Sequence, residues 1–106
     1  MRRVRIHAAA AEEAVEAAAW YEQQRSGLGA EFEQAIEASL DLLEAEVVPL
    51  VPVPGTAGTR GVKRLLLRRF PYAVIVRESA VDVVVIAFAH SARRPGYWRG
   101  RVKRGL

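Results

Sequence analysis

The chain opens with alternating polar and apolar residues and then changes to a helical spacing. Residues 3–7 alternate in this way around Val4 and Ile6, which is the period of a half-buried strand. From Ala8 to Gln24 the chain is rich in alanine, the residue with the highest helix propensity. The apolar face expected for this helix consists of Ala8, Ala11, Val15, Ala18 and Ala19.

A second helical pattern follows the break at Gly27-Leu28-Gly29. Its apolar residues recur at steps of three or four and are Phe32, Ile36, Leu40, Leu43 and Val47. Because the break is short, the two helices should lie antiparallel as a hairpin. The apolar seam of this hairpin needs a sheet to cover.

The second half of the chain predicts strands. Pro49 to Gly61 contains three prolines and three glycines, so it is expected to be a surface connection. Three strand-like runs follow, and they should form an antiparallel meander: Val62 to Arg69, Ala73 to Glu78 and Val83 to Ala89. The last run is apolar throughout, which predicts a strand covered on both faces with the first strand beside it.

The predicted fold class is α+β. It consists of an N-terminal strand, an antiparallel helix hairpin and a three-stranded antiparallel meander, with the helices packed on one face of the sheet. The length of 106 residues fits a single domain spanning residues 1–106. After Ser91, Pro95-Gly96 indicates a loop and Tyr97-Trp98-Arg99 a helical turn.

The composition restricts the cellular compartment and the kinds of metal, disulfide and cofactor chemistry that we expect of this chain. The absence of cysteine excludes a disulfide framework and a thiolate zinc site. No signal-peptide pattern is present, and no apolar run approaches the roughly 18 residues of a membrane span. With two histidines and no phosphate-binding loop, we expect no metal and no cofactor. The expectation is a cytoplasmic protein without a membrane partner.

Charge divides the chain into an acidic and a basic part. The net charge is +4. Residues 8–46 hold ten acids and one base, whereas residues 60–106 hold twelve bases and two acids. This asymmetry predicts one surface that attracts phosphates or acidic partners, and acidic helix faces that are solvated.

Several short motifs together resemble one protein family. They are Trp20-Tyr21-Glu22, Gly27-Leu28-Gly29 with Phe32, Arg69-Phe70-Pro71-Tyr72, and His90 followed by Arg93, Arg94, Pro95, Tyr97 and Trp98. In order and spacing they resemble the RelE/ParE toxins over nearly the whole chain. The resemblance implies the toxin of a type II toxin-antitoxin system, of the plasmid stabilisation kind. Such a toxin inhibits growth and is neutralised by a cognate antitoxin, in a possible hetero-oligomer.

The resemblance implies one of two targets. ParE-like members poison DNA gyrase, whereas RelE-like members cleave messenger RNA on the ribosome. The segments 70–72 and 90–98 look more like the ParE branch, so gyrase inhibition is the favoured prediction and the endonuclease is the alternative. Whether the chain is an enzyme stays open. A third hypothesis is that the chain is a module that only binds an antitoxin or a nucleic acid.

The endonuclease alternative has four catalytic candidates: Arg77, His90, Arg94 and Tyr97. Cleavage by a 2'-hydroxyl needs a base, an acid and cations around the phosphate. The arginines would hold the phosphate, and Tyr97 or His90 would transfer protons. Lys63 is the only lysine before the last residues, and this scarcity disfavours a ribonuclease because arginine is a poor proton carrier.

The candidates for binding are Lys63, Arg64, Arg68, Arg69, Arg93, Trp98 and Arg101. The favoured role of several of these arginines is to dock an acidic antitoxin segment, although charges on a sheet edge also prevent aggregation.

Structural roles compete with these functional ones. His90 continues a strand on the same predicted face as Ile86 and Phe88, which favours a hydrogen-bonded cap at the strand end. Tyr97 and Trp98 are expected to anchor the tail, which is the segment that begins at Ser91, against the sheet rather than to stack on RNA. Trp20-Tyr21 should pack the helix onto the sheet.

Overall fold

A five-stranded mixed sheet forms the centre of the fold in a computed structural model that describes residues 2–47 and 49–102. The strand order is β1-β5-β4-β3-β2, with β1 parallel to β5 and the other pairs antiparallel. The strands are β1 (Arg3–Ile6), β2 (Val51–Pro52), β3 (Val62–Leu66), β4 (Tyr72–Glu78) and β5 (Asp82–His90). The expected meander and the place of the first strand beside β5 are therefore confirmed.

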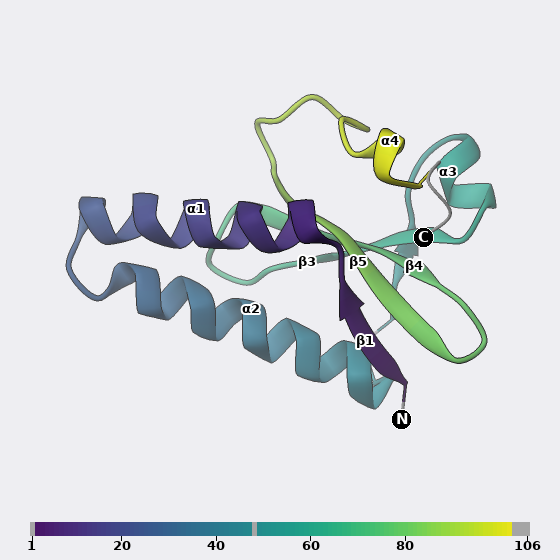
Figure 1. Cartoon of the computed structure of the whole chain (residues 1–106), viewed down its shortest axis with the longest axis horizontal. Coiled ribbons are helices and arrows are strands. Elements are labelled where there is room, and N and C mark those ends of the chain that lie inside the picture. The colour runs from purple at the N-terminus through teal and green to yellow at the C-terminus, as the bar shows by residue number, and fades with distance from the viewer. Residues whose placement is uncertain (1, 48, 103–106) are drawn as a thin grey trace.

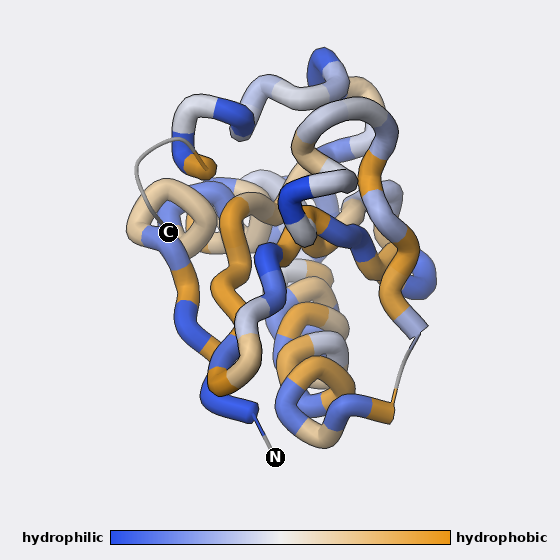
Figure 2. The backbone as a smooth tube through the Cα atoms, turned by 90° about the vertical axis from the view of Figure 1, so that its right-hand side faces the viewer, coloured by the Kyte–Doolittle hydropathy of each residue, from blue (hydrophilic) through white to orange (hydrophobic). Residues whose placement is uncertain are grey.

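The helices cover the sheet unequally. The antiparallel hairpin of α1 (Ala8–Gln24) and α2 (Leu28–Ala45) packs on one face (Figure 1). The one-turn helices α3 (Thr56–Thr59) and α4 (Arg99–Val102) lie toward the other face. Apolar and hydrophilic stretches alternate along the chain (Figure 2), as expected of elements that each bury one side.

Two apolar clusters lie on opposite faces of the sheet. The cluster under the hairpin is built around Phe32, Leu43, Val74, Val85 and Phe88, all buried. The cluster under the tail contains Val53, Val62, Ile75, Ile86, Ala87, Trp98 and Val102. Since β5 contributes to both clusters, the prediction of a strand covered on both faces is confirmed.

The proline-rich connection contains regular structure, so the prediction of a plain surface connection was wrong in part. Val51 pairs with Arg64 and Pro52 with Lys63, which places β2 at the edge of the sheet. An edge strand tolerates proline because one of its sides needs no backbone donor. The single turn of α3 was too short to produce a helical pattern in the sequence.

The predictions for both long helices were also wrong in part. The buried residues of α1 are Ala10, Ala17 and Ala18, so Ala18 is the only buried member of the predicted apolar face, and Val15 is 69% exposed. Because alanines occupy every side of α1, periodicity could not select the face that packs. Val47 lies beyond α2, which ends at Ala45.

A β-bulge changes the expected faces of β5. Ile75 pairs with Ala87 while the next residue, Val76, pairs with Val85, so Ile86 is the extra residue. Ile86 therefore joins the cluster under the tail, whereas Phe88 joins the cluster under the hairpin. The prediction that residues 86, 88 and 90 share one face was wrong because strict alternation does not hold across a bulge.

Gly29 allows the two helices of the hairpin to approach each other. A Cβ atom at this position would lie 2.6 Å from the carbonyl oxygen of Ala18, which is backbone and cannot move away cheaply. We expect Gly29→Ala to lower the free energy of unfolding by about 2 kcal/mol, as for other overpacked sites. Chemical denaturation would measure the change. Gly100→Ala is the matched control, because nothing lies within 4 Å of the added carbon. An equal loss in both variants would contradict this account of Gly29.

Candidate functional site

The tail side of the sheet carries a pocket that we call the basic pocket. It has a volume of about 200 Å³ and lies where the β2–α3 connection, the sheet and the tail meet. Its lining residues are Val53, Pro54, Arg64, Ala73, Ile75, Ala89, His90, Ser91, Arg93, Arg94, Pro95, Gly96, Tyr97, Trp98 and Arg99. Apolar side chains of the sheet form part of the wall, and the tail supplies most of the charge.

Positive charge dominates the basic pocket. Arg64, Arg93, Arg94 and Arg99 line it, and none of its lining residues is acidic. Within residues 2–47 and 49–102, no ion pair engages any of these four arginines. The pocket therefore presents uncompensated positive charge beside apolar surface, which suits an anionic ligand with apolar parts.

Glu13 of α1 holds the tail that forms one wall of this pocket. Its carboxylate accepts hydrogen bonds from the Tyr97 hydroxyl at 2.5 Å, the Phe88 backbone N–H at 3.1 Å and the Arg101 guanidinium at 2.9 Å. Arg101 also donates to the carbonyl of Ile86, the bulged residue, at 2.9 Å. The side chains of Glu13 and Arg101 are only 13% and 20% exposed. A single carboxylate thus joins the first helix, the bulged strand and the tail.

The hydroxyl of Tyr97 is engaged in its hydrogen bond to the Glu13 carboxylate. Burial raises the pKa of Tyr97 well above its ordinary value, and the hydrogen bond to the Glu13 carboxylate raises the pKa further. The guanidinium carbon of Arg93 lies 3.9 Å from the centre of the Tyr97 ring. Tyr97 is therefore held as a hydrogen-bond donor that resists losing its proton.

His90 has the structural role expected of a histidine at a strand end. Its Nδ1 accepts a hydrogen bond from the backbone N–H of Ala92 at 2.9 Å, and its ring meets that of Tyr72 edge-on at 5.1 Å. His7 uses the same device, because its Nδ1 accepts from the N–H of Ala9 at 3.1 Å and caps α1. One nitrogen of His90 is thus occupied by the backbone.

The structure brings together only some of the predicted site residues. Of the four catalytic candidates, His90, Arg94 and Tyr97 line the basic pocket. Arg77 does not line it, and pairs in register with Val62 and Val84 further along the sheet.

The binding candidates divide in the same way. Arg64, Arg93 and Trp98 line the pocket, whereas Lys63, Arg68, Arg69 and Arg101 do not. Trp98 is 6% exposed within the apolar cluster under the tail, so it anchors the tail as expected. Arg68 is exposed, and Arg69 forms an ion pair with Glu31 at 2.6 Å.

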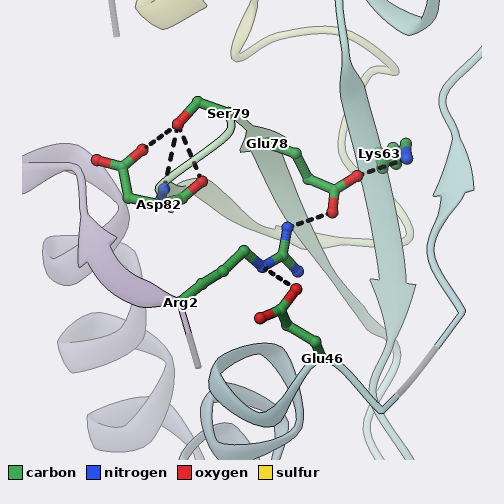
Figure 3. Close-up of polar contacts among 6 residues, drawn as sticks. All are labelled: Arg2, Glu46, Lys63, Glu78, Ser79 and Asp82. Atoms are coloured by element: carbon green, nitrogen blue, oxygen red, sulfur yellow. Dashed lines mark hydrogen bonds and ion pairs between the residues drawn. The ribbon is translucent and has the colours of Figure 1, made fainter.

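Lys63 belongs to an ion-pair network at the opposite end of β4 (Figure 3). Its Nζ lies 2.5 Å from a carboxylate oxygen of Glu78. Arg2 forms a second ion pair with Glu78 and lies 3.4 Å from Glu46, which follows α2. The network ties the start of the chain to the end of α2 and to two strands. Lys63 is therefore a structural residue here, because Lys63 and Arg64 point to opposite faces of β3.

The network should stabilise the fold in a pH-dependent manner. The hydrogen bond from Lys63, followed by that from Arg2, holds the pKa of Glu78 below its ordinary value despite partial burial. A depressed pKa contributes stability above the unfolded-state pKa of about 4.3 and loses it as the pH falls through the lower folded-state pKa. We expect Glu78→Gln to cost about 1 kcal/mol of unfolding free energy at neutral pH. Denaturation at decreasing pH should show this difference shrinking to zero. A difference that stays constant into strong acid would contradict this role.

Two features were missed or mispredicted from the sequence. Glu13 was not singled out, because nothing local distinguishes it from the other glutamates of the acidic segment. Tyr21 packs against Phe32 and Phe70 as expected, with ring centres 5.1 and 5.0 Å apart. Trp20, however, is 56% exposed, so the prediction that it packs onto the sheet was wrong. Adjacent helix residues differ by about 100° in direction, and here Tyr21 points into the core while Trp20 lies toward solvent.

Two further findings concern membranes and metals in the part of the chain that the structure describes. None of its helices is long and apolar enough to cross a membrane. It also contains no group of three or more potential metal-binding side chains.

Comparisons with known proteins bear on the fold. No family model and no curated protein sequence matches the chain. Among solved structures, a chain from the chromosomal ParDE TA system of P. aeruginosa is similar, with a TM-score of 0.72 and 17% sequence identity. The match covers 85% of this chain and 96% of that chain. At this identity the likeness establishes the fold, so the expected RelE/ParE-like α+β fold is confirmed.

Proposed function

We propose that this chain is the toxin of a type II toxin-antitoxin pair and acts by binding a protein target, with DNA gyrase as the favoured target. The observation that carries the proposal is the basic pocket, set in a fold shared with a chain of a ParDE TA system. The toxin works in the cytoplasm and is held inactive in a hetero-oligomer with its antitoxin.

The chemistry of the basic pocket supports an acidic antitoxin segment as its ligand. Four arginines surround a wall that includes Pro54, Ile75 and Trp98. A segment with carboxylates and a few apolar side chains complements both parts, since arginine pairs with carboxylates in bidentate geometry. Such a segment would cover the working surface of the toxin.

The contacts of three side chains favour binding over catalysis. The Tyr97 hydroxyl donates to Glu13 and has a raised pKa, and His90 Nδ1 accepts from the backbone. Lys63, the only lysine of the described residues, is paired with Glu78 away from the pocket. A general base or acid needs a free group with a pKa near neutrality.

The alternative is a ribosome-dependent messenger RNA endonuclease. One observation favours it: His90, Arg94 and Tyr97 line the same pocket, where arginines could hold a phosphate. In that case substrate binding would have to release Tyr97 from Glu13 before it could transfer a proton.

Controlled expression in a bacterium, with separate pulse labelling of new protein and new DNA, tests the proposal. Early arrest of DNA synthesis would support gyrase inhibition, whereas early loss of protein synthesis would support the endonuclease. Normal growth would contradict both and leave a module that only binds. If a short open reading frame adjoins the gene and encodes the antitoxin, its co-expression should restore growth.

A further inference from the structure

The helix hairpin carries an apolar groove that is separate from the basic pocket. The groove has a volume of about 660 Å³, and all of its lining residues belong to α1 and α2. Its floor includes Ala14, Ala18, Gly29, Ile36 and Leu40. Because the helices approach closely at Gly29 and carry small side chains there, no side chain of the hairpin fills the groove.

Apolar surface on the banks of this groove is left open to solvent. Val15 lines the groove and is 69% exposed, so this large apolar side chain has no packing role in the core of the protein. Ala19 and Ala30 also line it and are exposed. Val15 extends the surface into a neighbouring hollow that it shares with Ala11. The apolar strip is therefore continuous along α1, as a docking site for another helix requires.

Acidic side chains border the groove on both helices. Glu33 and Glu37, one turn apart on α2, line it, and Glu12 and Glu16, one turn apart on α1, line the neighbouring hollow. All four are exposed, and none forms an ion pair with another described residue. Like charges one turn apart disfavour the free helix, and a partner that brings positive charge relieves this repulsion.

We propose that this groove is a second docking surface, which takes a basic amphipathic helix of a partner protein. The apolar side of the partner helix would cover the floor and Val15, and its lysines or arginines would meet the glutamates on both banks. A face-to-face second copy would set the same acids against each other. Nucleic acids and anionic membranes are repelled by the same charges. The proposal does not depend on the toxin assignment, because the groove shares no residue with the basic pocket.

The probe for this proposal is a synthetic peptide of about 18 residues, built from leucine and lysine with the leucines on one helical face. A leucine and glutamate peptide of the same pattern is its counterpart. We expect the lysine peptide to bind the full chain, and Glu33→Lys to raise its Kd about fivefold or more. Asp41→Lys is the matched control, since Asp41 is exposed on α2 but does not line the groove. Equal effects of the two reversals, or equal binding of the glutamate peptide, would overturn the proposal.

Val15→Asp separates docking in the groove from general charge attraction. The added carboxylate would tighten binding of the lysine peptide if charge alone mattered, whereas loss of the apolar contact should weaken binding. Circular dichroism would verify that the variant keeps its helices. Tighter binding would overturn the proposal, as would self-association of the chain that Glu33→Lys abolishes, because the groove would then belong to a second copy. These measurements need no toxicity, so they remain decisive if the toxin assignment fails.

Discussion

Replacing Glu13 by alanine should lower the free energy of unfolding by about 3 kcal/mol, as expected for removing one partner of a largely buried ion pair. The substitution leaves the guanidinium of Arg101 and the backbone N–H of Phe88 without their acceptor. It also releases the Tyr97 hydroxyl, so the tail loses its attachment to α1. Chemical denaturation would give the loss in stability, and hydrogen exchange would show whether the tail opens first.

Glu12→Ala is the matched control for this prediction. Glu12 precedes Glu13 on the same helix, is exposed and has no hydrogen bond or ion pair with a described residue. Its removal should change stability by no more than about 0.5 kcal/mol. If both substitutions cost the same, the tether through Glu13 would contribute nothing specific, and the tail would be held by Trp98 packing alone.

Reversing two charges of the basic pocket should nearly abolish antitoxin binding under the proposed function. Arg64→Glu combined with Arg94→Glu removes two cations from the pocket wall and places carboxylates opposite an acidic ligand. Like charges placed together at an interface cost several kcal/mol, so the Kd should rise roughly a hundredfold. Titration with the purified cognate antitoxin would measure the change. Neither arginine stacks on the Tyr97 ring, which Arg93 and Arg101 contact, so the tail should stay in place.

Arg60→Glu combined with Arg68→Glu controls for overall charge. Both arginines are exposed and neither lines the basic pocket. This variant has the same net charge as the pocket variant, so it should lose only a small part of the affinity, and that part should vanish as salt is added. Equal losses would show that the antitoxin is attracted by the net charge of the chain, and that the pocket is not its binding site.

The local sequence pattern was sufficient to predict a structural feature where a single segment contained all the residues that determine it. The alanine-rich run predicted α1 with the bounds that the structure shows, Ala8–Gln24. The continuous apolar run of β5 predicted a central strand covered on both faces, because only such a strand can bury every side chain. The concentration of bases after residue 60 likewise predicted a basic surface.

The local sequence pattern was insufficient where the structure of one segment depended on another segment that packs against it or pairs with it. The packed side of α1 could not be read from a helix with alanine all around it. The bulge at Ile86 is a property of the pairing of β4 with β5, and neither strand signals it alone.

The sequence by itself determined the order of the two long helices and of strands β1, β3, β4 and β5, the fold class and the excess of positive charge in the second half of the chain. The tertiary structure decided which charges act together. Lys63 and Arg64 are adjacent in sequence, yet one joins an ion-pair network and the other lines the basic pocket, because side chains alternate across a strand. Glu13 meets Tyr97 and Arg101 only because α1 crosses β5 beside the tail. Periodicity is a property of one segment, whereas a site is a property of distances between segments.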